Sequence, residues 1–192
     1  MARVVFMCGP AGSGKSTFAR RLEERGMVRL SFDVELWRRG LPGALPPGPV
    51  RAEVESELKE RLLWLVSEGR DVVLDFSFWS RAMRDDYRGL LEPFGVVPET
   101  IYLATDRETV LERVRDRRGA HADDAVLSEE MAAQYFDGFE VPTEAEGPLR
   151  VVHFRRSRGS EVDDVEMVER HHDAGQHRDE AGNEGGTHGR RA

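Results

Sequence analysis

A glycine-rich run near the start of the chain constrains the fold more than any other part of the sequence. The nine residues from Gly9 to Thr17 read GPAGSGKST and fit the pattern G-x-x-x-x-G-K-[ST]. The apolar segment Val4–Met7 precedes this run, and Ser16–Arg25, with helical spacing, follows it. A strand, a glycine-rich loop and a helix in this order are typical of a phosphate-binding loop. The alternative is an ordinary glycine-rich turn.

Lysine is rare in this chain, which makes its place in the run informative. Of the 28 basic side chains, only Lys15 and Lys59 are lysines. An ammonium is a compact point charge on a flexible stem, whereas a guanidinium is a wide planar fork. A loop wrapped around a phosphate has room for the first and little for the second. We therefore expect Lys15 to contact a bound phosphate.

The run also predicts a specific set of nucleotide contacts. Its backbone N–H groups are expected to converge on phosphate, helped by the positive end of the following helix. Lys15 would bridge the β- and γ-phosphates of ATP, and Ser16 would place its hydroxyl on Mg²⁺. The expected nucleotide-binding residues of the loop are Gly9, Ala11, Gly12, Ser13, Gly14, Lys15, Ser16 and Thr17.

Length, charge and cysteine content exclude several classes of protein. The 192 residues have room for one domain of ordinary size. No apolar run approaches the roughly 20 residues of a membrane helix, and we expect no signal peptide before the first strand. A net charge of −8 argues against long nucleic acid as the main partner. Because Cys8 is the only cysteine, we expect a reduced, cytoplasmic protein.

Apolar and helical segments alternate up to about residue 156, which we take as one domain. Helical spacing recurs at 16–25, 51–68, 80–91, 105–118 and 128–139, and residues 40–49, with four prolines, form a loop. The alternation predicts a three-layer α/β/α fold with a five-stranded parallel sheet covered on both faces. The expected strands are Val4–Met7, Val28–Phe32, Asp71–Phe76, Ile101–Ala104 and Leu149–Phe154.

The alternating pattern ends at the C-terminal tail, residues 157–192. Residues 161–172 allow one acidic helix, but the rest is polar without apolar spacing, and we expect the tail to be disordered. A metal site among the histidines is the alternative to solvated polar chain. Four of the six histidines lie here: His171, His172, His177 and His188.

Two aspartates end or follow predicted strands, where a parallel sheet forms its ligand crevice. Asp33 comes directly after the second strand, and Asp75 ends the apolar run of the third. A carboxylate at Asp33 can orient and deprotonate an attacking hydroxyl, and the alternative is an N-cap for a helix over 34–39. Asp75 fits the acidic position that assists Mg²⁺ in phosphate-loop proteins, and its alternative is a capping aspartate.

Several arginines lie close to these carboxylates in the sequence. Arg38 follows Asp33, while Arg81 and Arg84 open the helix after Asp75. Each is a candidate contact for an anionic substrate group, and the alternative for each is a solvated surface arginine.

The helix predicted over 105–118 is rich in arginine. Arg113 and Arg117 are four residues apart and would share a helical face. A helix that delivers arginines over phosphates is typical of a lid in phosphoryl transfer, and we predict a lid around 106–125. The alternative is an exposed helix on which Glu112 and Asp116 pair with neighbouring arginines.

Together these segments resemble small ATP-dependent kinases. The matching segments are the phosphate loop, the SFD sequence at 31–33, residues 75–81 and the RRGAH sequence at 117–121. The group includes gluconokinase-like, shikimate-kinase-like and zeta-toxin-like enzymes and the kinase domain of polynucleotide kinases. Residues 134–144 are similar to the stretch before the last strand in gluconokinase-like proteins. The resemblance covers about residues 3–155 and implies a nucleoside-monophosphate-kinase-like fold.

The resemblance also implies roles for the matched residues. Asp33 corresponds to the general base, Arg113 and Arg117 to lid arginines near the adenine and phosphates, and 140–147 to the adenine side. Polynucleotide kinases typically place an arginine three residues after the base, where this chain has Leu36. The expected function is Mg²⁺-dependent transfer of the γ-phosphoryl group of ATP to a hydroxyl of a small molecule. A polynucleotide 5′-hydroxyl kinase and a non-catalytic or toxin-like nucleotide-binding module are the alternatives, and the oligomeric state stays open.

Overall fold

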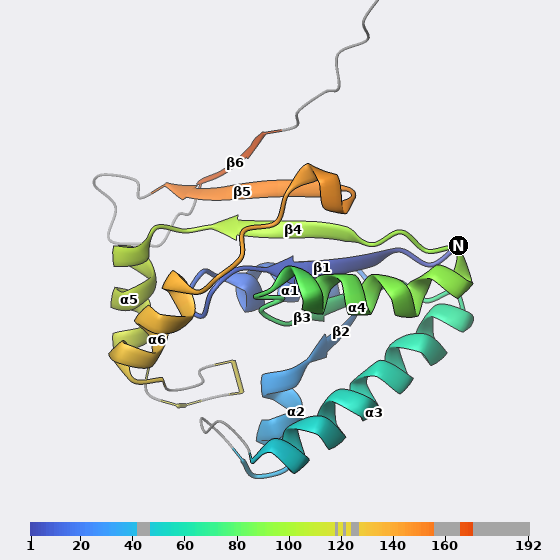
Figure 1. Cartoon of the computed structure of the whole chain (residues 1–192), viewed down its shortest axis with the longest axis horizontal. Helices are drawn as coiled ribbons and strands as arrows, with labels where there is room; N and C mark the ends of the chain where they lie inside the picture. Colours follow the sequence, from blue (N-terminus) through green and yellow to red (C-terminus); the bar gives the residue numbers. More distant parts are fainter. Residues whose placement is uncertain (42–46, 118, 121, 124–126, 156–165, 171–192) are drawn as a thin grey trace, which may run out of the picture.

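Strand β1 (Val4–Cys8) lies in the interior of the sheet, and all five of its residues are buried. A strand this apolar leaves no face for solvent, which is typical of parallel sheets that helices cover on both sides. The structure is a computed structural model that describes residues 1–41, 47–117, 119–120, 122–123, 127–155 and 166–170 (Figure 1).

Five parallel strands form the main part of the sheet. Their order is β2-β3-β1-β4-β5, which confirms the predicted five-stranded parallel sheet. In this register Ser31 of β2 pairs with Asp75 of β3, so the two strands end side by side. The four strands that join β1 are β2 (Val28–Ser31), β3 (Val72–Asp75), β4 (Glu99–Ala104) and β5 (Leu149–Arg155).

A sixth strand, β6 (Glu166–Arg170), pairs antiparallel with β5. The sequence predicts disorder or an acidic helix here, and for these five residues both predictions are wrong. The physical reason is the edge of β5, whose outer row of N–H and C=O groups can pair with a further extended segment. The rest of the tail, with its four histidines, lies outside the described residues.

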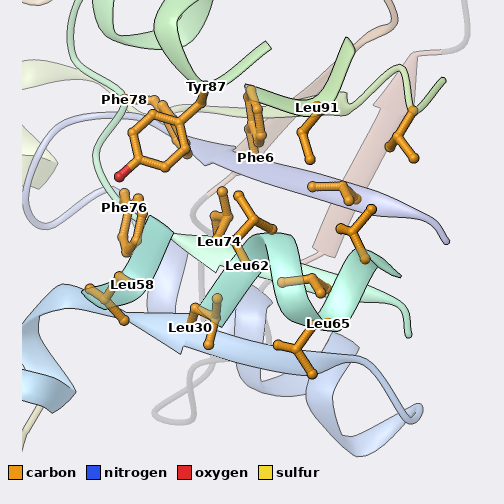
Figure 2. Close-up of a cluster of buried hydrophobic side chains, with 14 of the residues drawn as sticks. Phe6, Leu30, Leu58, Leu62, Leu65, Leu74, Phe76, Phe78, Tyr87 and Leu91 are labelled. Atoms are coloured by element: carbon orange, nitrogen blue, oxygen red, sulfur yellow. The ribbon is translucent and has the colours of Figure 1, made fainter. Parts of the chain in front are cut away.

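Two apolar clusters cover the two faces of the sheet. On one face, α3 (Gly48–Ser67) and α4 (Arg81–Leu91) bring Leu62 and Tyr87 against Phe6 (Figure 2). On the other face, α1 (Lys15–Glu24) buries Phe18 against Met7. Successive side chains of a strand point to opposite faces, so β1 supplies both clusters.

The remaining helices lie around the ends of the strands. Helices α5 (Arg107–Arg115) and α6 (Glu129–Asp137) lie together at the carboxyl end of β4 (Figure 1). Helix α2 (Phe32–Arg38) follows β2, and two 3₁₀ turns, η1 (Glu92–Phe94) and η2 (Glu144–Glu146), precede β4 and β5. No described helix is both long and apolar enough to cross a bilayer.

Two predicted helix boundaries differ from those in the structure by three residues. Helix α5 ends at Arg115, before the predicted limit at 118. Helix α3 begins at Gly48, inside the predicted loop, because a proline in a first turn has no N–H to leave unpaired. Residues 42–46 of that loop lie outside the described residues.

Candidate functional site

The loop between β1 and α1 leaves the N-terminus of its helix uncapped. Gly14 is the N-cap of α1, lies in the left-handed region at φ 99° and supplies no side-chain cap. The first N–H groups of a helix have no acceptor within it, and its positive end attracts anions. The N-termini of α2, α4, α5 and α6 are instead capped by Ser31, Ser80, Asp106 and Ser128. The terminus of α1 can therefore receive a phosphate.

Neighbouring elements hold this loop closely. Gly12 has φ 85°, and a Cβ there would lie 2.8 Å from the carbonyl oxygen of Val110 on α5. Thr105 Oγ1 donates to the carbonyl oxygen of Ser13 at 3.0 Å, and Gly9 N–H donates to the carbonyl of Ser77 at 3.1 Å. The loop conformation is thus supported from the ends of β3 and β4.

Lys15 lies within the loop and is partly buried. Its Nζ donates to the carbonyl oxygen of Pro10 at 2.8 Å. Burial lowers the pKa of Lys15, while the carboxylates of Asp75 and Asp33 act in the opposite direction. Among the described residues, one carbonyl accepts from this ammonium. An anion that binds there would replace part of the hydration that the ammonium has lost. The position therefore suits a phosphate oxygen.

Asp33 lies in the first turn of α2 and does not cap it. Helix α2 begins at Phe32, and Ser31 is its N-cap, with Val34 N–H donating to Ser31 Oγ at 3.4 Å. The capping alternative for Asp33 is therefore wrong, because the serine at the strand end takes that role. The Asp33 carboxylate therefore has no capping role at the start of α2.

The charges around Asp33 place it beside the loop. The protein atoms that crowd it and the Asp75 carboxylate raise the pKa of Asp33, although the residue still opens to solvent. Lys15 and Arg117 lower that pKa, so both cations lie within electrostatic range of the carboxylate. Lys15 lies at the uncapped terminus of α1, and Asp33 and Arg117 lie within electrostatic range of this lysine.

The predicted metal residues, Ser16 and Asp75, are in contact. Ser16 Oγ donates to Asp75 Oδ1 at 3.3 Å, and the Asp75 side chain is only 2% exposed. Among the described residues, no group of three or more His, Cys, Asp or Glu side chains forms a metal centre. A hydroxyl and a carboxylate together still fit Mg²⁺, which prefers oxygen ligands and usually retains water and phosphate oxygens.

Two further residues, Arg29 and Asp123, belong to this cluster and were missed in the sequence. Arg29 Nε donates to Asp75 Oδ2 at 3.0 Å, and its Nη1 donates to Asp123 Oδ2 at 3.3 Å. The available signal was a charged residue between two apolar residues, Val28 and Leu30, of a predicted strand. No sequence pattern marked Asp123, because its contact with Arg29 spans 94 residues of chain.

The predicted lid arginines approach the loop from different elements. Arg113 on α5 donates from Nη1 to the carbonyl oxygen of Gly12 at 3.3 Å. Arg117 lies beyond the end of the helix, so the predicted shared helical face is wrong. The charge of Arg117 nevertheless acts on Lys15 and Asp33. Residues 118, 121 and 124–126 of the predicted lid lie outside the described residues.

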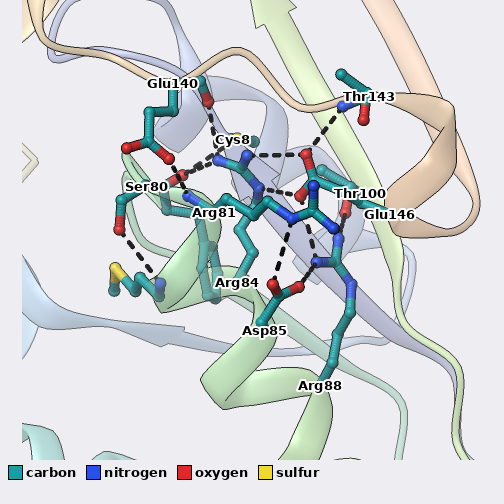
Figure 3. Close-up of polar contacts among 12 residues, drawn as sticks. Cys8, Ser80, Arg81, Arg84, Asp85, Arg88, Thr100, Glu140, Thr143 and Glu146 are labelled. Atoms are coloured by element: carbon teal, nitrogen blue, oxygen red, sulfur yellow. Dashed lines mark hydrogen bonds and ion pairs between the residues drawn. The ribbon is translucent and has the colours of Figure 1, made fainter.

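Arg84 has a different place from the one predicted. It is fully buried, and its Nε and Nη2 donate to the Glu146 carboxylate at 2.7 and 3.0 Å (Figure 3). Its Nη1 donates to the carbonyl oxygens of Phe78 and Glu140, both at 2.9 Å. The prediction of a substrate contact is wrong for Arg84, because protein acceptors already use these donors.

Arg38 and Arg81 are both exposed. Arg38 lies 3.8 Å from Glu35 and lines a cavity of about 300 Å³ along β2 whose walls do not include Asp33. Arg81 Nε donates to Asp85 at 3.4 Å, and its backbone N–H donates to Glu140 at 2.7 Å. A substrate contact by either residue stays a prediction.

Solved structures of kinases share this fold. A suspected kinase from Chloroflexus aurantiacus matches with a TM-score of 0.64 at 20% identity, over 79% of this chain and 88% of that one. A gluconokinase from Sinorhizobium meliloti matches with a TM-score of 0.55 at 20% identity, over 79% and 82%. An APS kinase from Mycobacterium tuberculosis, in complex with AMPPNP and APS, matches with a TM-score of 0.54 at 23% identity, over 81% and 90%.

The chain also matches a protein family. No curated protein matches the chain. Residues 4–142, which include the phosphate loop and both aspartates, match the AAA domain family AAA_33. The chain therefore belongs to this AAA domain family and has the α/β fold of P-loop kinases.

Proposed function

We propose that this protein transfers the γ-phosphoryl group of ATP to a hydroxyl group of a small molecule, with Mg²⁺ as the metal. One observation carries the proposal. Lys15 lies at the uncapped terminus of α1, within electrostatic range of a second cation, Arg117, and of the Asp33 carboxylate, which belongs to the first turn of a helix that Ser31 already caps. A phosphate site with a carboxylate beside it suits attack by an alcohol.

Each charged group has a distinct role in the proposed reaction. The α1 N–H groups and Lys15 hold the β- and γ-phosphates, and Arg113 and Arg117 neutralise the charge that develops on the transferred group. Ser16 and Asp75 would hold Mg²⁺, which neutralises phosphate charge when bound. Asp33 accepts the proton of the acceptor hydroxyl as the new O–P bond forms and the bond to the leaving ADP breaks.

The relatives support a small acceptor. Two of the solved structures with this fold are named as a gluconokinase and an APS kinase, and the second was solved with both AMPPNP and APS bound. The net charge of −8 also disfavours a polyanionic acceptor. The acceptor should therefore be sought first among sugars and other small alcohols.

Asp33→Asn tests the proposal directly. We expect transfer to fall by about 10²–10⁴-fold with ATP binding retained, because the amide cannot accept the proton. The measurement is ADP release with a panel of sugars, nucleosides, antibiotics and 5′-hydroxyl oligonucleotides, alongside calorimetric binding of ATP. Glu35→Gln, which removes a carboxylate from the same helix, is the matched control.

Three results would redirect the assignment. An unchanged rate in Asp33→Asn would remove Asp33 from catalysis. Transfer to oligonucleotides alone would favour the polynucleotide kinase alternative. ATP binding without transfer to any acceptor would favour a nucleotide-binding module.

A further inference from the structure

Strand β2 places one charged side chain among apolar residues. Leu30 belongs to the cluster that α3 covers, and Val28 packs against that cluster. Because side chains alternate along a strand, Arg29 points to the opposite face, toward α1. Its side chain is only 7% exposed. A buried guanidinium needs acceptors for its donors, and its partners therefore indicate its role.

Those partners are two carboxylates from distant parts of the chain. Arg29 pairs with Asp75 at the end of β3, which is 2% exposed, and with Asp123 between α5 and α6, which is 11% exposed. The planar fork of a guanidinium can bind both at once, whereas an ammonium presents a single point of charge. Arg29 therefore joins the predicted lid segment to the end of β3.

The two oxygens of the Asp75 carboxylate face different groups. Oδ2 accepts from Arg29 Nε at 3.0 Å, and Oδ1 accepts from Ser16 Oγ at 3.3 Å. A carboxylate fixed through one oxygen cannot rotate freely, so the direction of the other oxygen is set. Arg29 holds Asp75 in the orientation that faces Ser16.

Other charges complete the surroundings of this cluster. Arg20 of α1 lies 3.9 Å from Asp123 Oδ2 and is half exposed, so it only partly balances that carboxylate. Asp33 carries a third negative charge within range of both Asp75 and Asp123. On the cationic side, Lys15 acts on Asp33 and is itself acted on by Asp75. Arg29 is the cation that contacts both Asp75 and Asp123.

We propose that Arg29 is a positioning residue for the Mg²⁺ site. It aims Asp75 Oδ1 at Ser16, and it holds Asp123, which lies between α5 and α6, against the same site. The inference rests on the proposed function, because it concerns the metal that would accompany ATP. Arg29 lies outside the phosphate loop and is neither the proposed base nor one of the lid arginines.

The first test measures nucleotide binding with and without the metal. Calorimetry measures the affinity for ADP in the presence of Mg²⁺ and in the presence of EDTA. The ratio of these two affinities, called the Mg²⁺ ratio, measures how much the metal contributes to binding and requires no turnover. In Arg29→Met we expect this ratio to fall by about 10-fold, while the affinity in EDTA stays within about twofold. Arg29→Lys keeps the charge but loses the fork, and we expect a smaller fall in the same direction.

The second test separates the two contacts of Arg29. Asp123→Asn weakens the contact to the lid segment and leaves the pair with Asp75, so the Mg²⁺ ratio should stay close to that of the unmodified protein. Trypsin should then cleave after Arg117 about five- to tenfold faster, because the contact between Asp123 and Arg29 is weaker. Mass spectrometry identifies the cleaved bond. Asp116→Asn, which changes an exposed carboxylate of the same segment, is the matched control.

The outcomes distinguish this inference from the proposed function. If the unmodified protein binds no ADP, the proposed function fails, and the role of Arg29 fails with it. If it binds Mg²⁺ and ADP together and neither Arg29 variant changes the ratio, only the role of Arg29 is overturned. If Arg29→Met does not fold, Arg29→Lys and Asp123→Asn still test the role of Arg29. An unchanged Mg²⁺ ratio in Arg29→Lys together with unchanged trypsin cleavage in Asp123→Asn overturns that role.

Discussion

Two cations lie inside this protein in opposite situations. Lys15 has one described hydrogen bond, to the carbonyl oxygen of Pro10, and burial lowers its pKa. Arg84 donates to a carboxylate and to two carbonyl oxygens, and its pKa is raised by the Glu146 carboxylate despite the opposing effect of burial. Lys15 is partly buried and Arg84 is fully buried. For Arg84, protein acceptors replace the hydrogen bonds that water would make.

The contrast separates binding from stability. A buried charge without enough partners costs free energy until a ligand supplies them, so Lys15 is ready for phosphate. A buried charge with ideal partners fixes the elements that carry those partners. Arg84 joins α4 to the Phe78 carbonyl, to Glu140 and to η2. Removing the charge of Lys15 should therefore affect function, and removing the charge of Arg84 should affect stability.

Lys15→Met should have the largest effect. We expect phosphoryl transfer to fall by about 10³-fold, because the cation that meets the phosphates is gone. The thermal midpoint should stay the same or rise, since the protein loses a desolvated charge. ADP release and a calorimetric melt measure the two effects.

Lys15→Arg is the matched control for that change. It retains the positive charge but presents a wide fork in a loop that has little room for one, so activity should still be lost. Full activity in Lys15→Arg would refute the argument that the site needs a compact cation.

Arg84→Met should have the next largest effect, on stability. It leaves Glu146 buried without its main partner, and we expect the free energy of unfolding to fall by about 3 kcal/mol. Urea denaturation measures this change. Arg81→Ala on the same helix removes an exposed arginine and should cost less than about 0.5 kcal/mol.

These two variants also test the substrate contacts. If Arg84→Met raises the KM for the acceptor without loss of stability, Arg84 contacts the substrate and the contrast with Lys15 is wrong. A raised KM in Arg81→Ala would support the predicted contact of Arg81.

Acid should weaken the Arg84 cluster over a defined range of pH. Hydrogen bonds from Arg84 lower the pKa of Glu146 from 4.5 to about 2. The folded pKa lies below the unfolded one, so the stabilisation is complete above about pH 4.5 and is lost as the pH falls toward 2. The loss should reach about 3 kcal/mol. Urea denaturation at several pH values measures it, and Glu146→Gln should not show this part of the loss.

Much of the fold could be predicted from local patterns. Burial explains the apolar runs of β1 and β3 and the apolar spacing on α3 and α4. Each of these patterns is visible within the segment itself. The phosphate loop was equally readable, because the glycines and Lys15 that it needs are contiguous. Strand β6 was not, since its pairing depends on the edge of β5 rather than on its own sequence.

The candidate site was predicted less completely. Asp33 and Asp75 were singled out because Asp33 follows β2 and Asp75 ends β3, and the ends of parallel strands share one edge of the sheet. Their roles stay predictions. Arg84 was misassigned because a position near the site does not say whether the side chain turns inward. Arg117 was placed on a helix that ends two residues earlier, at Arg115.

The sequence by itself determined the α/β alternation, the phosphate loop and the aspartates that end or follow two strands. Each of these depends on neighbours within a few residues, so composition and spacing carry the information. Only the tertiary structure decided which cations suit a ligand and which already pair with acceptors of the protein. Arg84 meets Glu146 and Arg29 meets Asp123 across 62 and 94 residues of chain. Contacts at such separations are set by the packing of whole elements, which no local pattern records.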